Sequence, residues 1–306
     1  MKVLSLFDGM ACGMIAMQLA GIEVESYDAY EIDKYAIKTA RHNFPMIKEH
    51  GDVFLADFTQ YKGVDFLIGG SPCTYWSIAQ TKNRETVASG KGWELFSQYV
   101  RALHEAKPKY FIYENNKSMS KDIRASIDKT FGFEAVLINS ALVSAQNRQR
   151  LYWVGKRNAD GTYSKVNVEQ PADRGILLRD ILENGVVWQE KSYNLTTRCC
   201  CAIPEDTLKR HRHTMVAEPI EPKSGKTHPV YEVRNGLITI KGKQYPINLQ
   251  DGYYIIRKLT VRECMRLQTV PEWYEFPVSD SQAYKMLGNG WTCEVIAHIL
   301  KGLKEA

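Results

Sequence analysis

Strand-like and helical segments alternate along the first 157 residues of this 306-residue chain. The first strand-like run, Val3–Phe7, is followed by a turn with two glycines, 8–13, and by a helical pattern that ends at Gly21. Parallel strands must be joined by crossover connections, which are usually helices. The alternation therefore predicts an α/β fold with a doubly wound, mostly parallel sheet and helices on both of its faces.

The later segments continue this order. We expect a strand at Glu23–Tyr27, a helix at Lys34–Asn43, a strand near Val64–Gly69, a helix at Trp93–Ala106, a strand at Tyr110–Tyr113, a helix at Lys121–Thr130, and strands around Glu134–Ser140 and Gln149–Lys156. Beyond residue 157 the alternation stops, and short strand-like runs appear at Leu237–Lys241 and Tyr253–Arg257. Helical patterns at Thr260–Leu267 and from about Trp291 to Lys304 close the chain.

Composition also separates a second module. Residues 186–256 contain ten Lys or Arg against seven Asp or Glu, and five of the eleven prolines. This excess supplies three of the five net positive charges, which favours a polyanionic partner. We predict a first domain at 1–170, a smaller, irregular, β-rich domain at 171–277 with its core at 186–256, and a C-terminal helix at 278–306 that returns to the first domain.

Several protein classes are disfavoured by simple counts. No apolar run reaches the roughly 20 residues that cross a bilayer, and the N-terminal segment contains Asp8 without a cleavage site after it. Seven cysteines, an odd number scattered along the chain, indicate a reducing compartment rather than a disulfide framework. We expect a cytoplasmic protein with no membrane partner and no obligatory protein partner.

Polar residues follow three of the predicted strands. An acidic residue, Glu31, comes about twenty positions after the glycine turn, as in nucleotide-binding units whose carboxylate binds ribose hydroxyls. Cys73 and Glu114 each follow an apolar strand, where open α/β sheets bind ligands. Arg148 and Arg150 are spaced to share one face of an extended segment. A buried structural thiol, a solvated acid and a surface ion pair are the alternative interpretations.

Taken in order, these segments resemble the C5-cytosine methyltransferases, which methylate cytosine in DNA. The resemblance spans nearly the whole chain and is closest in style to the de novo-type enzymes and to phage and bacterial members. It implies the Rossmann-like class I methyltransferase fold and a target-recognition domain at 171–277. The matching motifs are Phe7–Gly13, Glu31, Gly51–Val53, Gly70–Cys73, Glu114–Asn115, Gln146–Arg150, Arg257–Gln268 and Leu287–Asn289.

The resemblance assigns roles to these residues. It implies that Cys73 attacks C6 of a flipped cytosine and that Glu114 acts at N3, with Asn115, Arg148 and Arg150 completing the catalytic group. It also implies S-adenosyl-L-methionine as methyl donor and S-adenosyl-L-homocysteine as product. The implied cofactor-binding residues are Phe7, Gly9, Gly13, Glu31, Ile32, Asp52, Val53, Pro72, Leu95, Asn289 and Trp291.

Duplex DNA is the expected substrate. Within the predicted recognition domain, the expected DNA contacts are Arg198, Lys209, Arg210 and Arg212. Three adjacent cysteines, 199–201, with His211 and His213 downstream, invite a zinc interpretation. Structural zinc sites usually separate their first two cysteines by two to four residues, so we predict no metal.

The chain departs from the family pattern at three places. Asn116 stands where a valine usually follows Glu-Asn, Ile32 replaces an aromatic residue, and Gln268–Pro271 replaces Gln-Gly-Phe-Pro. Asn116 leaves open which donor or which modified cytosine is preferred. Two alternatives also stay open, a tRNA cytosine-5 methyltransferase of the same family and a catalytically altered DNA-binding homologue. The short chain suggests a bacterial or phage enzyme that acts in the bacterial cytoplasm, and whether it is one of a restriction-modification pair stays open.

Overall fold

The computed structural model describes residues 1–78, 84–221 and 229–305, which form two compact units. Unit 1 contains residues 1–139, 149–171 and 293–306, and unit 2 contains residues 140–148 and 172–292. Residues 140–148 and 278–292 thus group with unit 2, whereas the sequence analysis placed them outside the recognition domain.

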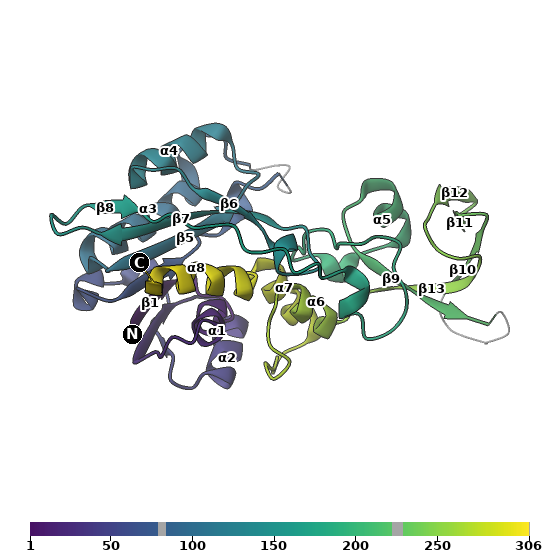
Figure 1. Cartoon of the computed structure of the whole chain (residues 1–306), viewed down its shortest axis with the longest axis horizontal. Coiled ribbons are helices and arrows are strands. Elements are labelled where there is room, and N and C mark those ends of the chain that lie inside the picture. The colour runs from purple at the N-terminus through teal and green to yellow at the C-terminus, as the bar shows by residue number, and fades with distance from the viewer. Residues whose placement is uncertain (79–83, 222–228, 306) are drawn as a thin grey trace. The chain divides into compact units, whose positions relative to one another are not determined.

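Unit 1 is built on an eight-stranded, mostly parallel sheet (Figure 1). The strand order is β3-β2-β1-β4-β5-β7-β6, with β8 paired to β7. All pairs from β3 to β5 are parallel, and β7 runs antiparallel to β5, β6 and β8. The bounds are β1 Lys2–Leu6, β2 Ser26–Tyr30, β3 Lys48–Glu49, β4 Phe66–Gly69, β5 Tyr110–Asn116, β6 Val136–Asn139, β7 Gln149–Arg157 and β8 Tyr163–Lys165. The predicted fold class is confirmed.

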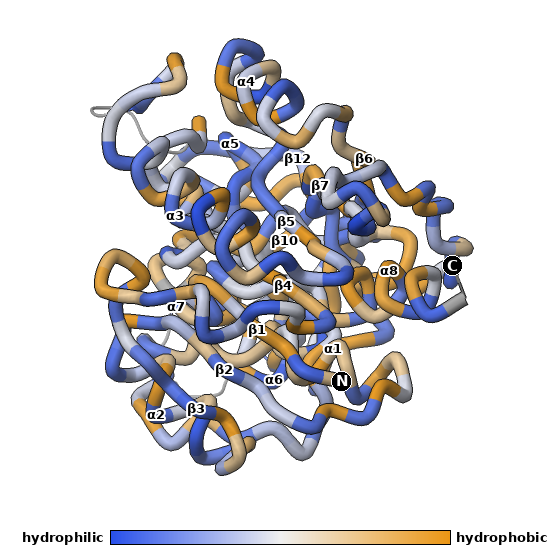
Figure 2. The backbone as a smooth tube through the Cα atoms, turned by 90° about the vertical axis from the view of Figure 1, so that its left-hand side faces the viewer, coloured by the Kyte–Doolittle hydropathy of each residue, from blue (hydrophilic) through white to orange (hydrophobic). Residues whose placement is uncertain are grey.

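Helices cover both faces of this sheet. Figure 1 shows α3 and α4 on one side and α1 with α8 on the other. The bounds are α1 Cys12–Leu19, α2 Lys34–Asn43, α3 Gly90–Ala106, α4 Lys121–Phe131 and α8 Cys293–Glu305, and short 3₁₀ turns lie at Val53–Leu55, Phe58–Tyr61 and Cys73–Tyr75. The central strands β1 and β4 are almost wholly buried, and their apolar residues are the orange segments at these labels in Figure 2. This buried layer holds the strand ends rigidly.

Unit 2 contains a five-stranded antiparallel sheet in the order β12-β11-β10-β13-β9. Its strands are β9 Met215–Ile220, β10 Val230–Arg234, β11 Leu237–Ile240, β12 Lys243–Pro246 and β13 Gly252–Lys258. Its helices are α5 Pro204–Arg210, α6 Val261–Leu267 and α7 Asp280–Asn289, with 3₁₀ turns at Ser140–Leu142, Leu178–Ile181 and Cys199–Cys201. A small apolar cluster that includes Ala217, Val233, Ile238 and Tyr254 forms the core of the sheet.

Two sequence-based assignments of secondary structure are wrong. The second strand begins at Ser26 rather than Glu23, because the chain leaves α1 through a left-handed Gly21 and Ile22 is bound back to Met17. The C-terminal helix predicted at 278–306 is two helices, α7 in unit 2 and α8 in unit 1, and Ala283, Tyr284 and Leu287 form a buried stripe of α7 at helical spacing.

Across the part of the chain that is described, no helix combines the length and the apolar character needed to span a membrane.

A buried ion pair stabilises unit 2. Arg257 contacts Glu263 at 2.8 Å and Glu218 at 2.7 Å, and the Glu263 side chain is fully inaccessible. Replacing Arg257 with methionine leaves the Glu263 carboxylate buried without its partner, so we expect a loss of about 3–5 kcal/mol in the free energy of unfolding. Urea titration measures this loss. The control is Arg262, an exposed arginine that pairs with Glu183 at 3.7 Å and with Glu272 at 3.4 Å. Arg262→Met should lower the free energy of unfolding by less than about 1 kcal/mol. Equal losses would contradict this account.

Candidate active site

Cys73 lies on a loop that is tied to the neighbouring strand. It begins a 3₁₀ turn four residues after the end of β4, and its side chain is partly exposed. Strands β4 and β5 are parallel neighbours with Gly69 opposite Tyr113, so the loop meets the end of β5. The buried Ser71 hydroxyl hydrogen-bonds the Tyr113 hydroxyl at 2.6 Å, and Asn115 Nδ2 donates to the Ser71 carbonyl at 3.1 Å. The backbone that carries the thiol is therefore held at the carboxyl ends of strands β4 and β5.

Glu114 and Arg150 meet across strands β5 and β7. Arg150 Nε lies 3.0 Å from Glu114 Oε1, and both side chains are nearly buried, with 12% and 11% exposed. A guanidinium beside a shielded carboxyl fixes the orientation of that carboxyl group. The structure thus brings together two residues that the sequence assigned to separate motifs.

Arg148 has a different environment from Arg150. It belongs to unit 2 and is almost fully buried. Its guanidinium donates to Asn194 Oδ1 at 3.0 Å and to the carbonyl oxygens of Leu195 at 3.2 Å, Gly288 at 3.3 Å and Gly290 at 2.7 Å. Arg148 therefore joins the chain at 194–195 to the end of α7, and its catalytic role remains a prediction.

The expected cofactor-binding residues of unit 1 surround the ends of β1 and β2. Glu31 Oε2 accepts a hydrogen bond from the Gly9 backbone N–H at 2.8 Å, and Oε1 accepts from the N–H groups of Ile32 and Asp33. Gly9 has a left-handed φ of 62°, which glycine adopts without strain. Ile32 is 74% exposed, so its apolar side chain is open to a ligand. Glu31 and Ile32 therefore present an acid and an apolar surface side by side.

The other residues predicted to bind the cofactor belong to separate segments of the chain. Phe7 has a left-handed φ of 58°, Pro72 is exposed beside Cys73, and Leu95 is half-buried in α3. Asp52 caps the turn that begins with the buried Val53, by accepting from the Phe54 N–H at 3.0 Å. Asn289 and Trp291 belong to unit 2, where Asn289 is the last residue of α7.

Gly13 has a packing role. A Cβ atom at this position would lie 2.4 Å from Ile68 Cδ1 and 2.6 Å from the Tyr27 hydroxyl. A larger residue at this position would require the ends of the Ile68 and Tyr27 side chains to shift. The cofactor role of Gly13 stays a prediction.

Asp8 is a site residue that the sequence analysis did not identify. Its Oδ1 accepts hydrogen bonds from the Ser5 hydroxyl at 2.5 Å and the Tyr27 hydroxyl at 2.6 Å, while Oδ2 is buried with no hydrogen-bond partner among the described residues. Burial raises the pKa of Asp8 to about 6, with a smaller contribution from the charge of Glu31. Burial likewise raises the pKa of Glu49 to about 8, and the charge of Asp8 adds to this shift. These neighbouring acids suit a ligand that carries positive charge.

The Asp8 environment predicts a pH-dependent stability. An acid whose pKa is higher in the folded than in the unfolded state stabilises the fold at low pH, and this contribution is lost as pH rises through the folded pKa. Asp8→Asn should therefore gain stability relative to the wild type between pH 4 and 6, reaching roughly 2 kcal/mol. Urea titrations of both proteins at several pH values measure the difference. A difference that does not change with pH would contradict the assignment.

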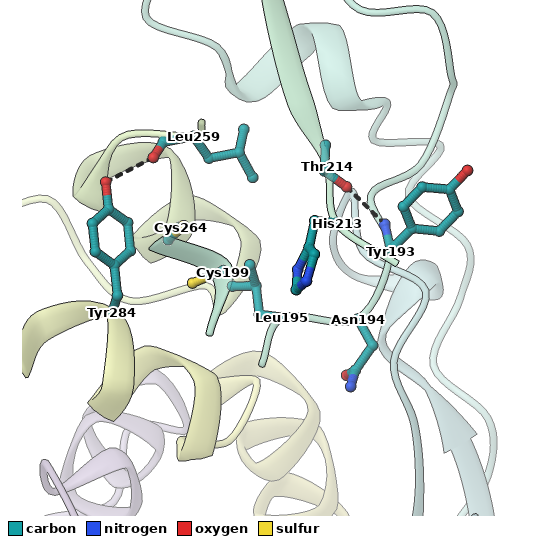
Figure 3. Close-up of a pocket in the computed structure, with 9 residues that line it drawn as sticks. All are labelled: Tyr193, Asn194, Leu195, Cys199, His213, Thr214, Leu259, Cys264 and Tyr284. Carbon is teal, nitrogen blue, oxygen red and sulfur yellow. Dashed lines mark hydrogen bonds between the residues drawn. The ribbon is translucent and has the colours of Figure 1, made fainter. Parts of the chain in front are cut away.

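The basic residues predicted to contact DNA all lie on the surface of unit 2. Arg198, Lys209, Arg210 and Arg212 are exposed, and Arg210 pairs with Asp206 at 3.5 Å. Near them, a cavity of about 10 Å³ is enclosed by side chains that include Cys199, His213 and Cys264 (Figure 3). This volume holds about one water molecule. A hydrogen bond with Cys199 and burial raise the pKa of the Cys264 thiol.

The described residues contain no group of three or more His, Cys, Asp or Glu that could hold a metal ion. The side chain of Cys200, one of the three adjacent cysteines, lies outside the described part.

Comparison with known proteins identifies the family of this chain. Residues 1–305 match the family described as C-5 cytosine-specific DNA methylase. The type II methyltransferase M1.ScrFI of Lactococcus lactis subsp. cremoris is 29% identical over 99% of this chain and 78% of its own length. M.HhaI of Haemophilus parahaemolyticus is 26% identical over 98% of this chain and 93% of its own. An orphan methyltransferase of Bacillus phage rho11s is 35% identical over 51% of this chain and 33% of its own length.

Solved structures show the same fold. The Spodoptera frugiperda DNMT2 mutant structure matches with a TM-score of 0.67 at 18% identity, over 99% of both chains. An Escherichia coli prophage protein described as a putative DNA modification methyltransferase matches with a TM-score of 0.60 at 21% identity, over 99% of this chain and 98% of that one. With the family match along the whole sequence, these likenesses show that the chain belongs to the C-5 cytosine-specific DNA methylases, enzymes that use S-adenosylmethionine as methyl donor.

Proposed function

We propose that this protein methylates C5 of a cytosine in duplex DNA through a covalent bond between Cys73 and C6 of the base. The observation that carries the proposal is the linkage between the Cys73 loop and the strand that bears Glu114. Ser71 is hydrogen-bonded to Tyr113 and Asn115, the two neighbours of Glu114. A nucleophile and an acid are thereby held on one rigid edge of unit 1.

Cytosine chemistry explains why both groups are needed. C5 is a poor nucleophile until a thiolate adds to C6, which forms the S–C6 bond and moves an electron pair toward N3. Glu114 supplies a proton to N3 as the general acid, and C5 becomes nucleophilic as an enamine carbon. When bound, S-adenosylmethionine would supply an electrophilic sulfonium methyl group, so that a C5–CH3 bond forms as the S–CH3 bond breaks and S-adenosylhomocysteine is the leaving group. A base then takes the C5 proton, the N3 proton returns to Glu114, and the Cys73 thiolate leaves, which restores the aromatic ring.

Arg150 supports this step by orienting Glu114. Its Nε contact with Oε1 fixes the plane of the carboxyl group at the end of β5. A fixed carboxyl group donates its proton to N3 in only one direction, which favours a cytosine that is correctly placed.

The residues that would hold S-adenosylmethionine fit a cationic ligand. The unpartnered Oδ2 of Asp8 and the carboxylate of Glu31 offer negative charge beside the glycine turn. Ile32 offers an apolar surface to an adenine ring, and Glu31 is suited to its ribose. We also assign Phe7, Asp52, Val53, Pro72, Leu95, Asn289 and Trp291 to this cofactor.

Duplex DNA requires that the target cytidine be rotated out of the stack, at a cost of a few kcal/mol. We propose that phosphate contacts from Arg198, Lys209, Arg210 and Arg212 offset this cost. We propose the bacterial cytoplasm, or that of a phage host, as the place of action.

A substrate containing 5-fluorocytosine tests the covalent step. Fluorine cannot leave C5 as a proton does, so methyl transfer should leave the enzyme bonded to the DNA. With S-adenosylmethionine present, we expect a protein–DNA band that survives denaturing electrophoresis and is absent for Cys73→Ala. A stable adduct with fluorocytosine-containing tRNA and none with DNA would move the function to the tRNA branch. The absence of an adduct with either substrate would overturn the proposal.

The DNA assignment predicts a specific effect of salt. Each phosphate contact should steepen the fall of log K against log salt concentration by about 0.9. Replacing Lys209, Arg210 and Arg212 with alanine should therefore lower that slope by up to roughly three, as measured by fluorescence anisotropy. Lys38→Ala and Lys129→Ala, which remove exposed lysines of unit 1, are controls that should leave the slope unchanged. An unchanged slope in the triple variant would show that these residues do not contact the backbone.

A further inference from the structure

We propose that Asn116 and Ser118 form a positioning pair that fastens the segment after Cys73 to the end of β5. This inference rests on the proposed function and deepens it. Asn116 takes the position at which the family pattern has valine. A valine side chain can neither donate nor accept a hydrogen bond.

The Asn116 side chain is buried and bonded at both ends. Asn116 is the last residue of β5 and only 5% exposed. Its Nδ2 donates to Asn115 Oδ1 at 3.2 Å, and its Oδ1 accepts from the Ser118 hydroxyl at 2.7 Å. Asn115 in turn donates to the Ser71 carbonyl. Asn116 therefore joins Ser118 to the residue that holds the start of the Cys73 loop.

Ser118 carries the connection to the far side of Cys73. Its hydroxyl oxygen accepts from the Ile78 backbone N–H at 3.4 Å. Its carbonyl accepts from Arg84 Nη2 at 2.7 Å, and Arg84 Nε donates to the Trp76 carbonyl at 3.3 Å. Ser118 thus contacts the segment after Cys73 directly at Ile78 and through the Arg84 side chain at Trp76.

Trp76 anchors this segment to the core. It is fully buried, and its indole N–H donates to Glu85 Oε2 at 3.1 Å. The Trp76 and Ser77 N–H groups both donate to the Cys73 carbonyl. Movement at residues 76–78 is therefore transmitted to the backbone of Cys73 itself.

Two anchors consequently bracket the nucleophile. Asn115 and Tyr113 hold Ser71 before it, and the Asn116–Ser118 pair holds Ile78 after it. Because displacement of about 1 Å at a reacting atom can cost 100-fold in rate, both anchors bear on the attack at C6. The Asn116 amide is engaged by Asn115 and Ser118, so its effect is on Cys73 placement rather than on the choice of methyl donor.

A double-mutant cycle tests the pair. The rate of adduct formation with duplex 5-fluorocytosine DNA is measured at saturating DNA and S-adenosylmethionine for wild type, Asn116→Val, Ser118→Ala and the double variant. We expect each single variant to react about tenfold more slowly and the double variant to be no slower than either, since both remove one connection. The dissociation constants for DNA and S-adenosylmethionine should not change.

Ser126→Ala is the matched control, because among the described residues the Ser126 hydroxyl donates within its own helix, to the Asp122 carbonyl, and its loss should leave the rate unchanged. Multiplying effects in the double variant, or losses confined to DNA affinity, would overturn the proposal. Hydrogen exchange of the Ile78 amide provides a test without turnover. It should be faster in both single variants, and unchanged exchange would overturn the pairing even if wild type forms no adduct. A wild type that forms no adduct would instead refute the proposed function.

Discussion

Cys73→Ala should abolish methyl transfer to duplex DNA, with a fall of roughly 10⁴-fold or more in single-turnover rate. Alanine removes the thiolate that must add to C6, and no other described side chain of the loop supplies a comparable nucleophile. The thiol is partly exposed on a loop held by other residues, so the fold should be retained. Transfer of a labelled methyl group to DNA measures the rate, and thermal unfolding checks the fold.

Cys201→Ala is the natural control for this experiment. Cys201 is an exposed thiol in unit 2, and its removal should leave the rate within a factor of about two of wild type. A Cys73→Ala protein that still methylates within tenfold of wild type would show that the attack on C6 comes from elsewhere.

Glu114→Gln should lower the methylation rate by roughly 10²–10⁴-fold, since glutamine can donate a hydrogen bond to N3 but cannot transfer a proton. The change also removes the charge partner of Arg150, whose Nε lies 3.0 Å from the carboxylate. The expected loss is in the rate of adduct formation at saturating DNA. Affinity for S-adenosylmethionine should be unchanged, because the acids assigned to that ligand, Asp8, Glu31 and Asp52, follow strands β1, β2 and β3.

Glu94→Gln provides the comparison, because Glu94 forms an exposed pair with Lys91 on α3. Its rate should equal that of wild type. If Glu114→Gln lost only DNA affinity and kept its rate of adduct formation, Glu114 would be a binding residue rather than the acid.

The sheet of unit 1 could be predicted because its local signals agree. Apolar runs, glycine turns and amphipathic helices alternate in the order that a parallel sheet requires, and α2 has the predicted bounds of Lys34–Asn43. The antiparallel direction of β7 relative to β5 could not be predicted from periodicity, because a strand buried on both faces is apolar in parallel and in antiparallel sheets alike. That pairing brings Arg150 beside Glu114.

Other features of the site depend on contacts that sequence patterns do not specify. Asp8 is visible in the glycine turn, but its burial against Tyr27 arises from the pairing of β1 with β2. Gly13 is predicted to bind the cofactor, and its close packing against Tyr27 and Ile68 is a contact that the sequence pattern does not specify. Asn116 departs from the family pattern, and its hydrogen bond with Ser118, which the sequence does not reveal, indicates what its side chain does.

The most direct test is nucleoside mass spectrometry after the purified protein is incubated with methyl-labelled S-adenosylmethionine and either duplex DNA or total tRNA. Labelled 5-methylcytosine in the DNA, absent with Cys73→Ala, is the result predicted here. Label in tRNA alone, or no labelled 5-methylcytosine in DNA despite bound S-adenosylmethionine, would contradict it.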